Sequence, residues 1–438
     1  MKPALLVAAT LVLALSGLAG AEGPAQPLSD QEPVVQPAGP AASPSPPGVT
    51  PSPAPGVAEP TKDLMDVIRE LRHKPPPPAG PPDFKKRMVA GSPVISYSPT
   101  SGAGVGVAGN VAFYRGYPEA TRISSIVASA IATTKSQFLL SAKINTSSLE
   151  NRWRVEADNR FFWTSQPTYG LGTDTNDAAK LDMKFNHFRI QDKFYRQVRR
   201  DVFLGAGANY NIHNNVRPGE DVDPDAFADS PYFSYSEEFG FDTDSQTSAG
   251  VSIHALVDSR DGAINPSRGW YANASYLMLF KDFLDGTSNW QQFSYDLRTY
   301  ARLSRDARHK LAFWAFGDLV TGGVAPYLDL PSTGGDTYAR SGRGYPQGRF
   351  RGQEMLYAEV EYRWTVTSNG LFGMVAFVNT ETLSDDQAGE KLLDSFATGA
   401  GFGFRFMLNK RSRTNLCFDI GFGEQGTRAV YFGVQEAF

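Results

Sequence analysis

Val202-Phe203-Leu204-Gly205-Ala206-Gly207-Ala208-Asn209-Tyr210-Asn211-Ile212-His213 is the stretch of sequence that decides the fold. Its even-numbered side chains are almost all apolar, and its odd-numbered side chains are small, polar or mixed. Successive side chains of an extended strand point to opposite faces, so a period of two indicates a β-strand with two different faces. The stretch therefore predicts a strand with one apolar face.

The same alternation continues through the C-terminal three quarters of the chain, which predicts an all-β fold. Sixteen segments show it: 93–98, 102–115, 121–134, 136–147, 152–164, 182–196, 201–214, 246–258, 269–283, 290–304, 309–320, 354–366, 370–382, 395–408, 414–424 and 428–438. Beyond the first hairpins, short spacers such as 196–200 alternate with long ones such as 215–245. Within 182–196, Met183 and Phe185 lose phase with Phe188 and Ile190, which predicts a β-bulge.

The first residues indicate export. Lys2 precedes the apolar run from Ala4 to Leu15, and small residues ending at Ala21 follow, so 1–21 has the features of a cleaved signal peptide. The apolar run is too short to span a bilayer as a helix. One cysteine, Cys417, excludes a disulfide framework, and a net charge of −4 gives no sign of a nucleic-acid partner.

Proline marks the next boundary. Eighteen of the 30 prolines lie between Glu22 and Met88, so 22–89 is expected to be a disordered periplasmic leader. Within it, 61–74 has apolar residues at helical spacing and predicts one short helix. That helix is either a docking or plug element or a marginal helix within the leader.

Alternation alone fits both a soluble β-sandwich and a membrane barrel, which turn opposite faces to water. The export signal and the aromatic residues at segment ends, among them Trp270, Trp364 and the terminal Phe438, favour the barrel. We therefore expect 90–438 to form a sixteen-stranded antiparallel transmembrane β-barrel. Its place would be the Gram-negative outer membrane, with both termini in the periplasm.

One loop carries a family resemblance. The residues Gly334-Gly335-Asp336-Thr337-Tyr338-Ala339-Arg340-Ser341-Gly342-Arg343-Gly344-Tyr345-Pro346-Gln347-Gly348-Arg349-Phe350-Arg351-Gly352 and the following segment 359–364 resemble the sixth extracellular loop and next strand of the BamA/TamA-type bacterial surface antigen superfamily. Barrels of that superfamily insert outer-membrane proteins or secrete partner proteins. Arg343-Gly344-Tyr345 is similar to the family motif whose arginine folds into the lumen and pairs with acidic residues on later strands.

The resemblance implies a lock that holds this loop inside the barrel. Alternation places Glu361 on the lumen face, and we expect it to be the first partner of Arg343. The family's second acidic residue falls on Asn379, where an amide replaces the carboxylate, and Glu381 replaces a family glycine. Arg349 and Arg351 are alternative arginines for the same role, and solvated loop charges are the remaining alternative.

Two further stretches resemble the family. Asp258, Arg260, Asp261, Pro266, Arg268 and Gly269 are similar to its periplasmic turn between strands eight and nine, where a structural role is favoured. The last strand resembles its C-terminal assembly signal through Gly433 and Phe438, although Glu436 stands at a position that is usually apolar. The proline-rich leader is unlike a POTRA domain, so a variant without POTRA domains is expected.

No nucleophile elbow, P-loop or zinc-protease motif occurs, so we expect no enzyme and no cofactor. His187, His213 and His254 are weak candidates for catalysis, and Asp221, Asp223, Asp225 and Asp229 for a calcium or lipopolysaccharide contact. Asp296, Arg298, Arg302, Asp318, Arg405 and Asp419 are expected to form salt bridges in the lumen or to line a pore. The expected partners are outer-membrane lipid, lipopolysaccharide, the membrane's assembly machinery and an exported protein or lipid.

The sequence leaves two functions open. One is a role in outer-membrane biogenesis or transport, in which a weak seam between the first and last strands lets protein or lipid pass sideways. The other is a passive or substrate-specific pore or scaffold without insertase activity.

Overall fold

The computed structural model describes residues 61–75, 86–98, 102–117 and 120–438. The predicted signal peptide and most of the predicted leader lie outside these residues. The described residues belong to one compact unit. Within the described residues, no helix is long and apolar enough to cross a lipid bilayer.

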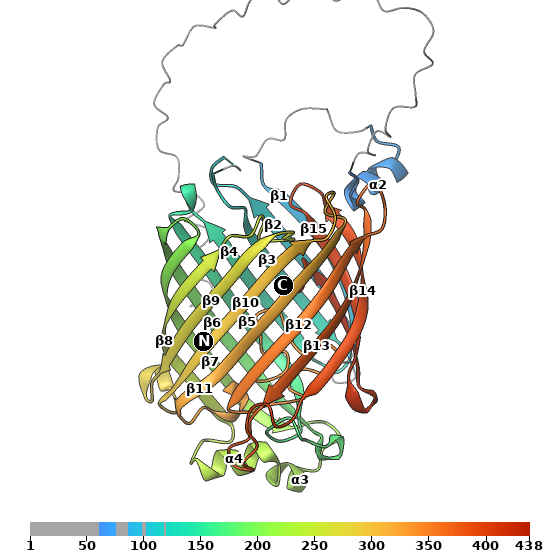
Figure 1. Ribbon diagram of the computed structural model, residues 1–438. Coiled ribbons are helices and arrows are strands. Elements are labelled where there is room, and N and C mark those ends of the chain that lie inside the picture. The colour runs from blue at the N-terminus through green and yellow to red at the C-terminus, as the bar shows by residue number, and fades with distance from the viewer. Residues whose placement is uncertain (1–60, 76–85, 99–101, 118–119) are drawn as a thin grey trace, which may run out of the picture. The chain divides into compact units, whose positions relative to one another are not determined.

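Sixteen antiparallel strands follow one another around a barrel, each paired with its neighbours in the chain (Figure 1). They are β1 Met88–Ser98, β2 Gly102–Phe113, β3 Ser124–Thr133, β4 Phe138–Ser147, β5 Trp153–Thr168, β6 Leu181–Arg199, β7 Val202–Pro218, β8 Ser245–Asp258, β9 Gly269–Leu279, β10 Trp290–Arg302, β11 His309–Gly323, β12 Glu354–Thr365, β13 Phe372–Leu383, β14 Ala397–Asn409, β15 Thr414–Phe422 and β16 Arg428–Val434. The sixteen-stranded barrel predicted from the alternation is confirmed.

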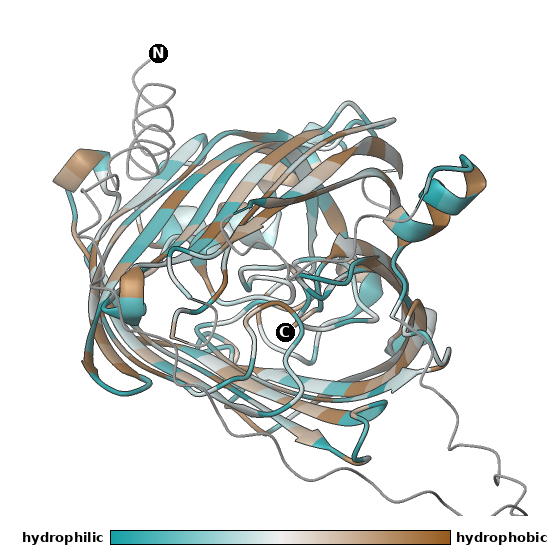
Figure 2. Ribbon diagram, turned by 90° about the horizontal axis from the view of Figure 1, so that it is seen from above, coloured by the Kyte–Doolittle hydropathy of each residue, from teal (hydrophilic) through white to brown (hydrophobic). Residues whose placement is uncertain are grey.

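The two faces of the wall separate as the alternation predicts. Leu204, Val251 and Phe293 are exposed on the outside, whereas Phe203 and Leu256 are buried within the barrel. Bands of both characters alternate along the strands in Figure 2. The outer face is thus an apolar belt, as a barrel surrounded by lipid requires.

The two ends of the barrel differ. One end is named here the turn end. At this end lie the connecting residues 114–117, 120–123, 148–152, 200–201, 259–268, 303–308, 366–371 and 410–413. At the other, the loop end, lie most of the long connections, including 219–244 with helices α3 Pro224–Ala228 and α4 Pro231–Glu238. Buried Tyr232 and Tyr235 of α4 pack there against Tyr327, which caps this end of the lumen.

Helix α2 Leu64–Leu71 lies within the predicted helical range 61–74 and sits at the turn end (Figure 1). Asp63 and Asp66 form a capping box at its N-terminus. The Lys410 backbone nitrogen donates to Asp63 at 3.0 Å, and the Lys410 Nζ atom lies 2.6 Å from an Asp66 carboxylate oxygen. These contacts join the short helix α2 to the β14–β15 turn.

The wall has one weak seam. β1 and β16 lie side by side, yet no ladder of paired residues joins them among the described residues, whereas each other strand pairs with both of its neighbours. β1 has 11 residues and β16 only seven. Much of the β1 edge therefore has no partner strand of matching length.

Two strand details differ from or refine the prediction. β1 begins at Met88, five residues before the predicted start at 93, because Met88 to Ser92 pair with 108–112 of β2. The bulge predicted in 182–196 is confirmed by a register shift between Lys184 and Asn186 in the pairing with β7.

The predicted last strand, 428–438, is wrong at its end: β16 stops at Val434. Gln435 has a φ of 83°, which turns the last residues out of the wall and into the lumen.

The apolar outer belt predicts that a charge placed within it destabilises the barrel. Ile253 in the middle of β8 and Leu284 in the β9–β10 loop are almost equally exposed, at 57% and 56%. Ile253→Arg should lower the free energy of unfolding of the vesicle-inserted barrel by about 2–4 kcal/mol, because a charge at mid-membrane is costly. Leu284→Arg should lower it by only about 0–1 kcal/mol. Urea titration of vesicle-inserted protein measures both, and equal effects would contradict a lipid-facing belt.

Candidate functional site

The loop between β11 and β12, residues 324–353, folds back into the barrel. It begins with the short helix η4 Tyr327–Asp329 and carries Arg343 to the inner face of β12. Gly342 and Gly344 flank Arg343 with φ values of 67° and 127°, which side chains with a Cβ rarely adopt. A Cβ on Gly344 would also lie 2.8 Å from the backbone of Phe422, so this close approach to β15 requires glycine.

Arg343 is fully buried among three carboxylates, a group named here the Arg343 cluster: Arg343, Glu359, Glu361 and Asp419. Its Nε atom donates to Glu359 at 3.1 Å, and its two Nη atoms lie 2.5 Å from Glu361 and 3.1 Å from Asp419. The guanidinium carbon also lies 3.6 Å from the centre of the Phe377 ring. Charge-assisted hydrogen bonds offset the cost of burying this guanidinium.

The structure brings Arg343 and Glu361 together and gives Asn379 a different contact. The Asn379 side-chain nitrogen donates to the backbone oxygen of Arg343 at 2.9 Å. The carboxylate missing at position 379 is supplied by Asp419 on β15, which the sequence placed only in a general luminal network. Glu381, also on β13, instead accepts from Thr333 at 2.8 Å.

Gly344 and Tyr345 fix the loop to the strands that precede the seam. The Gly344 nitrogen donates to the Tyr431 hydroxyl of β16 at 3.2 Å, and the Tyr345 hydroxyl donates to the Thr398 backbone oxygen of β14 at 2.7 Å. Burial raises the pKa of Tyr345 to about 12, so its hydroxyl remains a donor at neutral pH.

The last residues of the chain join the same region of the lumen. Glu436 accepts from Arg405 at 2.7 Å, and Arg405 lies 2.5 Å from Asp419. The Phe438 ring stacks 5.2 Å from Trp314, and its backbone oxygen accepts from Arg363 at 3.0 Å. A carboxylate at position 436 has no partner on a lipid face, which explains why these residues leave the wall.

Comparison with known proteins agrees with this geometry. Residues 164–438, more than half of the chain, match the family model described as the Omp85 superfamily domain. The chain belongs to the Omp85 superfamily. This confirms the family predicted from the loop at 334–352, and no curated protein sequence matches the chain.

Solved structures share the Omp85 barrel fold. BamA from Haemophilus ducreyi lacking POTRA domains 1–3 has a TM-score of 0.51 and 12% identity, over 80% of this chain and 70% of that one. CdiB from Escherichia coli has a TM-score of 0.50 and 12% identity, over 81% of this chain and 63% of that one. The chain thus spans less than two thirds of the CdiB protein.

The loop of this Omp85 barrel has further anchors. Asp329 in η4 lies 3.5 Å from His213 on β7 and also accepts from Ser248 of β8 and Asn211. Burial raises the pKa of Asp329 to about 6, although these hydrogen bonds oppose the shift. The start of the loop is therefore fixed to the opposite wall from the Arg343 cluster.

The alternative arginines do not reach the β12 carboxylates. Arg349 contacts the β5–β6 loop, with nitrogens 2.6 Å from the Thr175 hydroxyl and 2.9 Å from Asp177. Arg351 donates to the backbone oxygen of Tyr327 at 2.9 Å within the same loop. Both arginines shape the loop, and of these three candidates Arg343 is the one that pairs with the carboxylates of β12.

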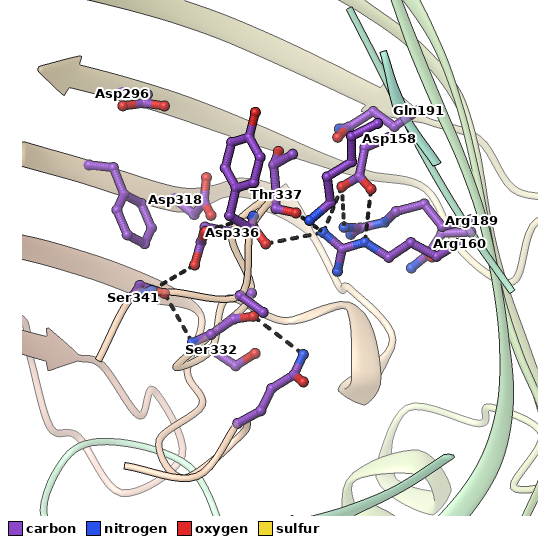
Figure 3. Close-up of a pocket in the computed structure, with 18 of the residues that line it drawn as sticks. Asp158, Arg160, Arg189, Gln191, Asp296, Asp318, Ser332, Asp336, Thr337 and Ser341 are labelled. Carbon is purple, nitrogen blue, oxygen red and sulfur yellow. Dashed lines mark hydrogen bonds and ion pairs between the residues drawn. The ribbon is translucent and has the colours of Figure 1, made fainter. Parts of the chain in front are cut away.

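A luminal cavity of about 550 Å³ lies between this loop and the wall (Figure 3). On one side Arg160 pairs with Asp158 at 2.6 Å and also donates to the backbone oxygen of Thr337 at 3.0 Å. On the other side lie Asp296 and Asp318. Of the remaining charges predicted for the lumen, Arg298 pairs with Asp296 at 2.5 Å, and Arg302 reaches Asp261 at the turn end at 3.0 Å.

The motif between β8 and β9 forms a dense turn. Asp258 is fully buried and accepts from Arg154 at 2.6 Å and from Arg260 at 2.9 Å. Asp261 accepts from the Ser267 nitrogen at 2.8 Å. Pro266 is buried and Gly269 has a φ of 102°, whereas the Arg268 side chain is exposed. These contacts support the structural role favoured for the motif.

The weak candidates make other contacts. His187 stacks on His213 at 4.4 Å between ring centres, and His254 lies 2.8 Å from the Ser252 hydroxyl. Asp223 accepts from the Asp225 backbone nitrogen and begins α3. Asp221 and Asp229 are exposed nearby. In the described part of the chain, no three His, Cys, Asp or Glu side chains converge as metal ligands would.

The Arg343 cluster generates a stability prediction. Arg343→Ala takes from buried Glu359 the arginine it pairs with, and from Glu361 and Asp419 one of theirs, so the free energy of unfolding should fall by about 3–5 kcal/mol. Urea denaturation of the detergent-solubilised barrel measures this change. Arg200→Ala, which removes a highly exposed arginine, is the matched control and should have little effect. Unchanged unfolding of the Arg343 variant would show that the cluster contributes no stability.

Proposed function

We propose that this Omp85 barrel resides in the outer membrane of a Gram-negative bacterium, with its turn end in the periplasm. There it takes part in the assembly or transport of other proteins or lipids. The apolar outer belt supports the placement, and the superfamily supports the type of activity. Its partners in this proposal are membrane lipid, lipopolysaccharide, assembly machinery and an exported protein or lipid.

The seam between β1 and β16 is the observation that carries the proposal. Backbone groups without partners are costly in hydrocarbon, so an incompletely paired edge is a place where another strand gains hydrogen bonds. A substrate strand that adds to the β1 edge would use ordinary β-augmentation. The same gap would give lipid or protein a lateral route between lumen and bilayer.

A path of ion pairs connects the loop with this seam. It runs from Arg343 to Asp419 at 3.1 Å, from Asp419 to Arg405 at 2.5 Å and from Arg405 to Glu436 at 2.7 Å. Glu436 lies two residues beyond the end of β16. In this proposal Arg343, Gly344, Tyr345, Glu361 and Asn379 lock the loop in the lumen, and the path links the loop's position to the shape of the seam.

The luminal cavity supports a second candidate, a pore. Figure 3 shows Arg160 and Arg189 across the cavity from Asp296 and Asp318, an arrangement that would orient charged solutes. A pore would conduct steadily in a planar bilayer and would not need the seam to open.

A disulfide across the seam distinguishes the two candidates. Cysteine pairs placed at 89–94 of β1 and 428–434 of β16 are screened for one that oxidises, since the buried Cys417 is not expected to compete. Cells depleted of the native protein and expressing the oxidised variant should lose the transported or assembled proteins or lipids from the outer membrane. Reduction should restore them.

The matched control is a disulfide between Ile420 and Val430, which already face each other in the β15–β16 pairing. It should leave function intact. Normal envelope composition with the seam closed, together with steady conductance, would contradict the assembly or transport role and support the pore.

A further inference from the structure

The turn end of the barrel carries a ring of exposed basic side chains. Arg152, Arg199, Arg200, Arg268, Arg305 and Arg411 are all exposed there. Arg199 ends β6, and the other five come from the connections after β4, β6, β8, β10 and β14, so the ring is spread around the rim. Within the described residues, Arg199, Arg268, Arg305 and Arg411 form no ion pair. The α3 and α4 region at the loop end is acidic instead, with Asp221, Asp225 and Glu237 exposed.

Tryptophans fix the depth of this ring. Trp153, Trp270 and Trp364 are exposed on the outer wall near the same end. Exposed tryptophans mark the interface between hydrocarbon and headgroups. Arg196 faces outward beside Trp153, with its guanidinium carbon 5.6 Å from the ring centre. Basic groups just beyond the tryptophans therefore lie at the level of lipid phosphates.

Helix α2 extends the same surface. Asp63 and Asp66 are held by Lys410, so the polar side of α2 faces the barrel. Met65, Ile68 and Leu71 are exposed on its other side, and Arg72, His73 and Lys74 follow directly. Figure 2 shows α2 outside the ring of strands. An amphipathic helix with basic neighbours at this depth has the composition of an interfacial membrane helix.

We propose that the basic ring and the apolar face of α2 form a binding surface for the anionic phospholipids of the leaflet around the turn end. The proposal rests on the membrane placement proposed above. A lipid leaflet surrounds the whole barrel, as the ring does, whereas an acidic protein partner would cover one sector. The surface thereby holds α2 beside the β14–β15 turn and leaves the acidic loop end unaffected.

Lipid preference of the full chain tests the ring. The protein is inserted into bilayers of phosphatidylcholine and phosphatidylglycerol, and its relative affinity for the two is measured by quenching of its tryptophans with brominated forms of each. Replacing Arg199, Arg268, Arg305 and Arg411 together with Gln should lower the preference for phosphatidylglycerol at least about fivefold. The control replaces the loop-end residues Lys180, Arg217, Lys281 and Lys391 with Gln and should change it little.

A single fluorophore tests α2. Labelled Ile68→Cys should be quenched by spin-labelled phosphatidylglycerol, whereas labelled Glu70→Cys, on the polar side, should not; Cys417 is buried and is not labelled. Equal quenching at both positions would overturn the role of α2. So would a label at position 68 that lipid does not quench and whose signal changes only when an acidic protein is added.

Insertion is checked by heat-modifiable migration in every variant. If the unaltered chain does not insert, the membrane placement fails, and this inference fails with it. If all variants insert and both fourfold variants keep the phosphatidylglycerol preference of the unaltered chain, only the lipid-binding surface is overturned.

Discussion

The burial of the Arg343 guanidinium among Glu359, Glu361 and Asp419 is the interaction on which the rest of the lumen depends. A wide barrel has too much interior to fill with wall side chains alone, and a loop of 30 residues lies inside it instead. Hydrophobic packing is non-directional, whereas a planar guanidinium with three carboxylates has one productive geometry. The ionic contacts therefore specify where the loop lies, and the aromatic contacts around them fill the remaining space.

The same constraint reaches the end of the chain. Asp419 serves both Arg343 and Arg405, and Arg405 in turn holds Glu436. The last four residues leave the wall to satisfy these charges, and β16 is left shorter than β1. The seam is thus a consequence of polar satisfaction inside the barrel, and the closure of the wall and the position of the loop are parts of one network.

The barrel could be predicted from the sequence because lipid-facing and lumen-facing residues alternate along most of the strands, and the pairing of Arg343 with Glu361 follows from that parity. It missed what depends on contacts across the barrel. Asp419 is 76 residues from Arg343, and nothing in its local pattern distinguishes it from other luminal acids. Glu436 was the available signal for the inward turn, since a charge at an apolar position of a last strand needs an internal partner. The early start of β1 was missed because its residues are small and alternate weakly.

The coupling free energy between Arg343 and Glu361 measures how strongly this ion pair holds the loop in the lumen. It is obtained from the urea unfolding of Arg343→Met, Glu361→Gln, the double variant and the unaltered barrel. A coupling of about 2–3 kcal/mol is expected, because Arg343 and Glu361 lie 2.5 Å apart and buried, so each single change costs this contact and the double change costs it only once. Additive effects of the two substitutions would contradict this expectation, since they would mean that the Arg343–Glu361 ion pair does not hold the loop in the lumen.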